Sequence, residues 1–246
     1  MIQKTPIATL IEDATKDIPG WSPQDQLLSL FILAFSSANL PGDILELGSW
    51  CGRSAVALGL AAKFSGKGKV HCVDLFPEKK DWYENADGTY SFAVEIDGRK
   101  VGAYGEQTVW AEPYLKDIAP VYEKYAGTLD AFNCAVATNQ LNDWVIPFKG
   151  DLLKFADHAP EGFAVRLAFV DGDHSYAAVA QDIEIVERFL LPGGWICFDD
   201  AFSSYDGVNE AIQKHIIDGS RYQCWQQITR KLFVAQRRHA DDGIKS

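Results

Sequence analysis

Three aspartates stand at the ends of two apolar segments in the second half of the chain. Residues 167–170 run into Asp171, and residues 195–198 run into Asp199 and Asp200. If both segments are neighbouring parallel strands, their carboxyl ends lie roughly 5 to 10 Å apart at one edge of the sheet. Carboxylates so close repel one another, so either some stay protonated or a hard divalent cation such as Mg²⁺ neutralises them. We expect the cation, held by Asp171, Asp199 and Asp200.

A second chemical feature is the segment 44–54, whose sequence is ILELGSWCGRS. It predicts a buried strand, a glycine turn and the first turn of an alanine-rich helix, whose free N–H groups face the turn. Gly48 and Gly52 allow the backbone to approach a ligand closely, and Ser54 opens the helix. Glu46 is a carboxylate inside an otherwise apolar strand, which favours a cationic or hydrogen-bond-donating ligand near the strand end.

An acid also ends the next predicted strand, residues 70–73, which follows the predicted helix 55–64. Asp74 lies roughly 20 residues beyond the glycine turn, where nucleotide-binding βαβ units place an acid that accepts hydrogen bonds from ribose hydroxyls. An aspartate at a strand end is also a common turn former. The coincidence of Asp74 with the glycine turn favours the ligand-binding interpretation.

The pattern Glu-x-Gly-x-x-x-Gly-x-Ser at 46–54 resembles the first motif of the class I S-adenosylmethionine-dependent methyltransferases. The resemblance implies S-adenosylmethionine as cofactor, with Asp151, after the predicted strand 144–148, accepting from the adenine amino group and Leu152 packing on the ring. An ordinary strand-to-helix turn is the alternative for the motif, and Gly150-Asp151 is also a routine turn dipeptide. The predicted cofactor-binding residues are Glu46, Gly48, Ser49, Gly52, Ser54, Asp74, Leu75, Asp151, Leu152 and Asp171.

The acidic cluster in turn resembles that of the metal-dependent small-molecule O-methyltransferases, including bacterial sugar-modifying enzymes. In several of these a lysine or histidine base stands three residues after the first acid, a position occupied here by His174. A histidine titrates near neutrality and can take the proton of a metal-bound hydroxyl, so His174 is the predicted catalytic base. The alternative is a turn and helix cap around Asp173 and Ser175, with a solvated loop at residues 199–200.

The resemblance implies an α/β doubly wound, mostly parallel sheet of seven strands, finished by a terminal antiparallel hairpin, for which residues 222–228 and 232–236 are the candidate strands. Two helices before the first strand form a cap at 1–40, followed by a methyltransferase domain at 41–238 and a polar tail at 239–246. Within the methyltransferase domain, an aromatic-rich insertion at about 76–127 contains a hairpin signal, Asp97-Gly98. The insertion either covers the site or forms a satellite core or subunit interface.

Composition restricts the function further. With a net charge of −11 the 246-residue chain is a poor nucleic-acid binder, and its five cysteines, an odd number without a Cys-x-x-Cys pair, indicate reduced thiols in a cytoplasm. Glu12 and Asp13 fall where a signal peptide would be uncharged, and the apolar run 27–35 is too short to span a membrane. A homo-oligomer is left open.

We therefore predict a cytoplasmic methyltransferase that O-methylates a small hydroxylated metabolite, a sugar or a phenol, with a divalent metal. Two rivals are weighed against it. A nicotinamide-dependent oxidoreductase would share the sheet, but the third glycine of its fingerprint and a Tyr-x-x-x-Lys pair are missing. A non-catalytic nucleotide-binding or assembly protein would keep the cavity without turnover.

Overall fold

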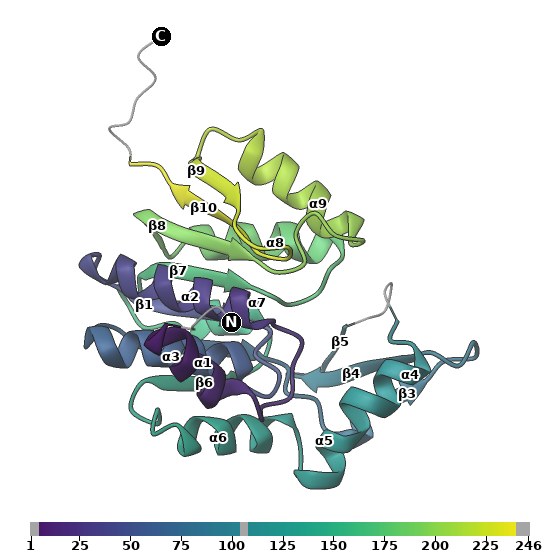
Figure 1. The fold of residues 1–246 in the computed structure, drawn as a ribbon. Helices are drawn as coiled ribbons and strands as arrows, with labels where there is room; N and C mark the ends of the chain where they lie inside the picture. Colours follow the sequence, from purple (N-terminus) through teal and green to yellow (C-terminus); the bar gives the residue numbers. More distant parts are fainter. Residues whose placement is uncertain (1–4, 104–107, 240–246) are drawn as a thin grey trace.

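A seven-stranded sheet is the centre of the computed structural model, which describes residues 5–103 and 108–239 (Figure 1). The strands follow the order β6-β2-β1-β7-β8-β10-β9, in which the first five pair in parallel and β10 pairs antiparallel with both β8 and β9. Their bounds are β1 Asp43–Leu47, β2 Val70–Asp74, β6 Val145–Lys149, β7 Val165–Val170, β8 Leu190–Phe198, β9 Tyr222–Gln227 and β10 Phe233–Arg237. The predicted doubly wound sheet with a terminal antiparallel pair is confirmed.

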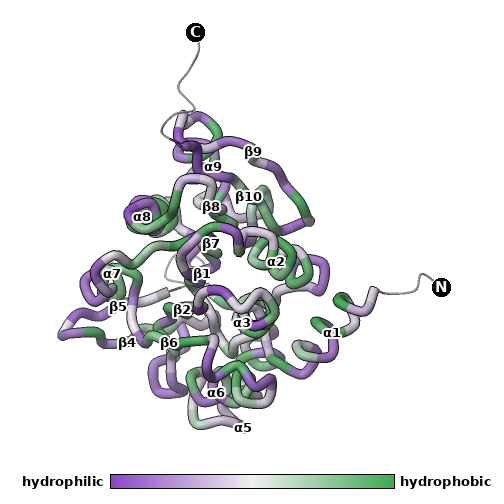
Figure 2. The backbone as a smooth tube through the Cα atoms, turned by 90° about the vertical axis from the view of Figure 1, so that its left-hand side faces the viewer, coloured by the Kyte–Doolittle hydropathy of each residue, from purple (hydrophilic) through white to green (hydrophobic). Residues whose placement is uncertain are grey.

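Helices cover both faces of this sheet, which is why its central strands are mostly apolar. One core packs α1, α2, α3 and α6 against one face, and a second packs α7, α8 and α9 against the other. Figure 2 shows α2 and α3 on one side of β1 and β7, with α7 and α8 on the opposite side. The α-helices are α1 Pro6–Thr15, α2 Gln24–Ser36, α3 Arg53–Ser65, α4 Ala111–Pro113, α5 Ala119–Lys124, α6 Thr128–Thr138, α7 Leu152–His158, α8 Tyr176–Glu187 and α9 Asp206–Ile212.

Short helical segments adjoin several of these elements. Two are 3-10 turns, η1 Ser37–Asn39 and η2 Lys79–Asp81, and two are π-helical turns, η3 Tyr114–Ile118 and η4 Gln213–Ile217. Within the described ranges, every helix is too short or too polar to cross a bilayer.

The segment Pro192 to Gly194 lies inside a strand although it contains residues typical of turns. Helix α8 ends at Glu187, and the proline and both glycines belong to β8. Gly193 has a φ of +80°, and the pairing register between β7 and β8 shifts beside it. Glycines therefore form an irregularity inside the strand, where they permit a bulge, rather than a turn before it.

The insertion forms a separate three-stranded antiparallel sheet, with β3 Trp82–Glu84, β4 Tyr90–Ile96 and β5 Arg99–Ala103. Asp97 and Gly98 both adopt positive φ between β4 and β5, so the predicted hairpin is present. Its buried alternate residues make a small satellite core with Trp82 and Ile118. Most of the predicted tail 239–246 lies outside the described residues.

Candidate active site

The carboxyl edge of the central sheet carries the predicted site residues in the order of its strands. Asp151 follows β6, Asp74 ends β2, Gly48 follows β1, Asp171 follows β7 and Asp199 follows β8. All five line one cavity of about 860 Å³. That volume lies in the range of about 300–1,000 Å³ that is typical of small-molecule sites. The fold therefore brings residues more than a hundred positions apart in sequence to a single cavity.

Gly48 allows the β1 turn to lie against the end of β7. Its φ is +80°, and a Cβ added to it would lie 1.7 Å from the carbonyl oxygen of Asp171. The turn is then tied to β2, because Oδ2 of Asp74 accepts a 2.8 Å hydrogen bond from the backbone N–H of Trp50. Oδ1 of Asp74 accepts from the backbone N–H of Phe76 at 2.5 Å. Burial raises the pKa of Asp74, and these backbone N–H groups oppose the increase.

Eight of the ten predicted cofactor residues line the cavity, and Glu46 and Gly52 are the two that do not. The Glu46 side chain is fully buried and accepts a 2.6 Å hydrogen bond from Oγ of Ser49, which itself lines the cavity. Burial raises the pKa of the Glu46 carboxyl. Gly52 packs on Phe132, whose ring lies 3.0 Å from the position of an added Cβ. Glu46 and Gly52 therefore support the glycine turn without lining the cavity.

Asp151 is held by two partners. Its Oδ1 caps α7 by accepting a 2.8 Å hydrogen bond from the backbone N–H of Lys154, and its Oδ2 lies 3.0 Å from Nη2 of Arg99 in β5. A neighbouring ion pair joins Lys154 to Asp97 in the hairpin turn at 2.9 Å. Residues of β5 line the cavity beside Asp151 and Leu152, so the insertion forms part of the cavity wall.

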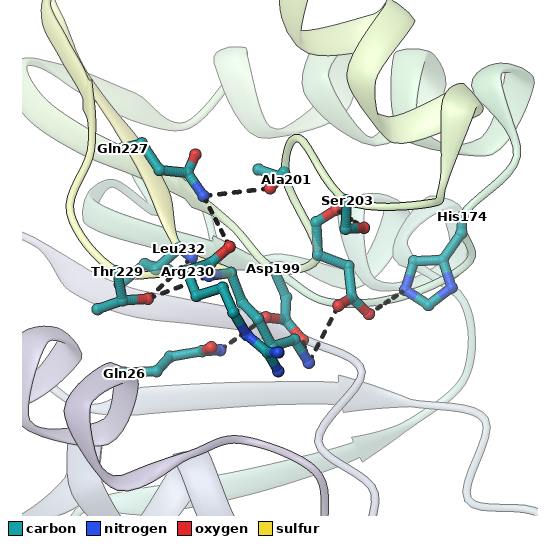
Figure 3. A network of polar contacts seen from close by, with 11 residues as sticks. Gln26, His174, Asp199, Ala201, Ser203, Gln227, Thr229, Arg230 and Leu232 are labelled. Carbon is teal, nitrogen blue, oxygen red and sulfur yellow. Dashed lines mark hydrogen bonds and ion pairs between the residues drawn. The ribbon is translucent and has the colours of Figure 1, made fainter.

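The predicted acidic cluster is present. Burial raises the pKa of Asp171 well above its usual range, and the charge of Asp199 and their shared hydrogen bond add to the increase. Asp199 directly follows β8, and its Oδ1 accepts a 2.8 Å hydrogen bond from Nε2 of Gln26 in α2 (Figure 3). Gln26 is fully buried, so α2 reaches the site through this amide.

The predicted magnesium site is not matched, because an ammonium group lies between two of its carboxylates. Nζ of Lys231 lies 3.1 Å from Oδ2 of Asp199 and 3.1 Å from Oδ1 of Asp200. Among the described residues, no three His, Cys, Asp or Glu side chains are arranged to hold a metal ion. The repulsion between the carboxylates, which favoured a metal from sequence, is relieved by a side chain instead. The three acids with Lys231 among them therefore do not fit Mg²⁺.

His174 lies beside this cluster. Its Nε2 is 3.4 Å from Oδ2 of Asp200, and its ring stacks on Tyr205 with 4.2 Å between centroids. Burial lowers the pKa of His174, and the nearby carboxylates of Asp200 and Asp199 oppose the decrease. His174 also lines the cavity, and the neutral imidazole is the form of histidine that accepts a proton.

Four residues of the site are absent from the sequence prediction: Gln26, Arg99, Tyr205 and Lys231. Of these four, Lys231 could have been found from the sequence. Because β10 runs antiparallel to β8 with Phe233 opposite Phe198, the hairpin turn returns Lys231 to the position opposite Asp200. Gln26 had only the weak signal of a polar residue beside an apolar helix face, and Arg99 depends on how the insertion packs.

Comparison with known proteins then decides the family. A family model described as a methyltransferase domain matches residues 45–201, from β1 to the acids after β8. The chain belongs to this methyltransferase family. The match spans both the glycine turn and the acidic cluster, so the predicted methyltransferase is confirmed at family level. No curated protein sequence matches the chain.

Solved structures with a similar fold include three methyltransferases. The O-methyltransferase NovP has a TM-score of 0.62 and 15% identity, with 89% of this chain and 84% of NovP covered. TomG from Streptomyces achromogenes, an O-methyltransferase of tomaymycin synthesis solved with SAM, has a TM-score of 0.55 and 13% identity over 97% and 92% of the two chains. A TDP-rhamnose 3'-O-methyltransferase of calicheamicin biosynthesis has 0.53 and 16% over 96% of both. These likenesses show the methyltransferase fold.

Proposed function

We propose that this methyltransferase transfers the methyl group of S-adenosylmethionine to a hydroxyl oxygen of a small metabolite, a sugar or a phenol. The observation that carries the proposal is the single cavity that joins the glycine turn at Gly48 and Asp74 to His174. A bound methyl donor and the proton acceptor His174 would therefore share one cavity. The O-methyltransferases with a similar fold, one of them solved with SAM, support the same chemistry.

The glycine turn fits a nucleoside with an attached amino acid. Asp74 accepts two backbone N–H groups, one on each oxygen, and each oxygen keeps a lone pair that a ribose hydroxyl can use. The indole N–H of Trp50 is buried at the cavity wall with no partner among the described residues, which leaves a donor for a carboxylate or other acceptor. The Asp74 carboxylate and the Trp50 indole therefore suit S-adenosylmethionine, which has no phosphate and needs no phosphate-binding glycine.

In the proposed reaction His174 accepts the proton of the acceptor hydroxyl. When bound, S-adenosylmethionine supplies a methyl group activated by a positively charged sulfur. As the acceptor oxygen forms its bond to that methyl carbon, the carbon–sulfur bond breaks and its electron pair stays on sulfur. Asp200, 3.4 Å from Nε2, stabilises the imidazolium that results. No step of this proposal uses a metal ion.

Aromatic side chains at the cavity favour a ring-shaped acceptor. Trp21 and Trp50 line the cavity with 5.7 Å between their ring centroids, and Trp110 lines it with 72% of its surface exposed. Exposed indoles are costly in water and offer a flat surface on which a sugar or phenol ring can pack. The acceptor is therefore proposed to be a small hydroxylated ring compound.

Calorimetry and a turnover assay test this function. S-adenosylmethionine is titrated into the wild-type protein, with NADH as the competing candidate, and release of S-adenosylhomocysteine is then followed with panels of sugars and phenols. We expect saturable binding of S-adenosylmethionine, none of NADH, and turnover with a member of one panel. Binding of NADH in place of S-adenosylmethionine would support the oxidoreductase alternative, and cofactor binding without turnover on any acceptor would support the non-catalytic one.

A further inference from the structure

Lys231 carries a positive charge and lies between two of the acids, Asp199 and Asp200. We infer that Lys231 is the resident cation of the acidic cluster and that this methyltransferase therefore works without a bound divalent metal. The inference rests on the proposed function only where methyl transfer is measured. Its structural part, a lysine in the position of a metal ion, can be tested without any acceptor.

The contacts of the Lys231 side chain are those of a buried counter-ion. Its Nζ lies 3.1 Å from a carboxylate oxygen of Asp199 and 3.1 Å from one of Asp200, and only 13% of the side chain is exposed. The two carboxylates compensate the cost of burying a positive charge. The ammonium is therefore a lasting part of the site.

Hydrogen bonds hold the turn that carries Lys231 beside the acids, and Figure 3 shows Gln227, Ala201 and Thr229 of this network. The carbonyl of Lys231 accepts a 3.0 Å hydrogen bond from the backbone N–H of Ala201, the residue after the acids. Oγ1 of Thr229 accepts from the backbone N–H groups of Lys231 and Leu232 at 3.3 and 3.1 Å. Nε2 of Gln227 donates to the carbonyls of Ala201 and Arg230, both at 3.1 Å. Turn and acids thus form one hydrogen-bonded unit.

A divalent ion would have to displace this unit. Mg²⁺ needs oxygen ligands at about 2.0–2.1 Å in near-octahedral geometry, and the gap between the two carboxylates is already spanned by Nζ. Oδ1 of Asp199 is also used by Gln26, and Asp171 is hydrogen-bonded to Asp199. A second cation beside the ammonium would be repelled by it. The same carboxylates would, without the lysine, be an ordinary set of hard oxygen ligands.

Lys231 also has a positioning role in the proposed reaction. It holds Oδ1 of Asp200, while Oδ2 of the same carboxylate faces His174. Loss of the ammonium would leave Asp200 free to turn toward other partners and would add an uncompensated negative charge beside the base. We expect this change to alter the pH dependence of turnover as well as its rate.

The first test measures metal binding with Mn²⁺ as a paramagnetic substitute for Mg²⁺. Electron paramagnetic resonance counts the free Mn²⁺ left by the wild-type protein and by Lys231→Met, with Lys214→Met in the exposed Lys214–Glu210 pair as the matched control. We expect no saturable site in the wild type or the control, and affinity at least about tenfold higher in Lys231→Met, because a positive charge within contact distance is removed. The new site is expected to be lost in Lys231→Met/Asp199→Asn.

Two outcomes of this titration overturn the inference. One is a saturable Mn²⁺ site in the wild type that Asp199→Asn removes; this titration is informative even if Lys231→Met fails to fold. The other is a folded Lys231→Met, judged by circular dichroism, that binds no more Mn²⁺ than the wild type.

The activity arm adds EDTA to the turnover assay. We expect wild-type methyl transfer to persist unchanged, and Lys231→Arg to retain more of it than Lys231→Met. Loss of wild-type turnover in EDTA, restored by Mg²⁺, overturns the inference. Failure to bind S-adenosylmethionine, measured separately, would instead overturn the proposed function and leave the metal titration valid.

Discussion

Nε2 of His174 lies 3.4 Å from Oδ2 of Asp200, in a part of the site where both side chains are at most 15% exposed. Burial lowers the pKa of His174 below its ordinary value of about 6.5, because the charged imidazolium loses its hydration. The neutral ring, which is the form that accepts a proton, therefore persists to lower pH than in a solvated histidine.

The first prediction concerns the pH profile that this relationship imposes. We expect the acid limb of kcat/KM to fall below the ordinary histidine range, since the base becomes protonated only at lower pH. His174→Gln is expected to reduce kcat by about 10²–10⁴-fold and to abolish that limb. Rates measured from pH 4.5 to 9 with saturating cofactor provide the check. A retained limb in His174→Gln would assign the proton transfer to another group.

Gly48 gives the second prediction. A methyl group there would lie 1.7 Å from the carbonyl oxygen of Asp171 and would hold a non-glycine residue at a φ of +80°. We expect Gly48→Ala to lower the free energy of unfolding by about 3 kcal/mol or more. Gly66→Ala is the matched control, since Gly66 also has positive φ but has open space around it, and about 1 kcal/mol is expected. Urea unfolding compares the two; equal losses would show that the contact with Asp171 is unimportant.

The third prediction concerns Asp74. Asp74→Ala is expected to weaken S-adenosylmethionine binding by about 1–3 kcal/mol, because ribose hydrogen bonds and the N–H of Trp50 lose their acceptor. Calorimetry measures this directly, and Asp157→Ala, an exposed position in α7, serves as control. Wild-type affinity in a correctly folded Asp74→Ala would place the ribose elsewhere.

The fourth prediction concerns stability at the opposite edge of the sheet. Burial opposes ionisation of Asp43, but hydrogen bonds from His71, at 2.8 Å, and from the backbone of Lys69 outweigh it and lower the pKa of Asp43. A carboxyl with a lowered pKa in the folded state contributes stability above its unfolded pKa and loses it as the pH falls. Asp43→Asn is therefore expected to destabilise the protein at pH 7, with a difference that shrinks below about pH 4. Urea unfolding at both pH values tests this; a constant difference would contradict it.

Local patterns explain why so much of the fold was predictable. Apolar runs predicted β1, β2 and β7, because strands buried on both faces have no room for polar side chains apart from a special case such as Glu46. The dipeptide Asp97-Gly98 predicted the hairpin for a similarly local reason, because these residue types tolerate the positive φ that both adopt in the turn. Asp74, Asp151 and Asp171 could be predicted to lie together because the carboxyl ends of parallel strands meet at one edge of the sheet.

Local patterns could not predict contacts between segments that are far apart in the sequence. The ion pair of Arg99 with Asp151 depends on how the insertion packs on the central sheet, and the amide of Gln26 reaches Asp199 across 173 positions of sequence. The metal prediction failed to fit for the same reason. It considered the repulsion among the acids but not the cation that the hairpin turn brings to them.

Strand β10 lies between β8 and β9 and is continuous with the turn that carries Lys231. Loss of the pairing between β8 and β10 would therefore withdraw the ammonium from Asp199 and Asp200. A substitution in β10 that weakens this pairing would change the balance of charge at the acids, although β10 itself does not line the cavity.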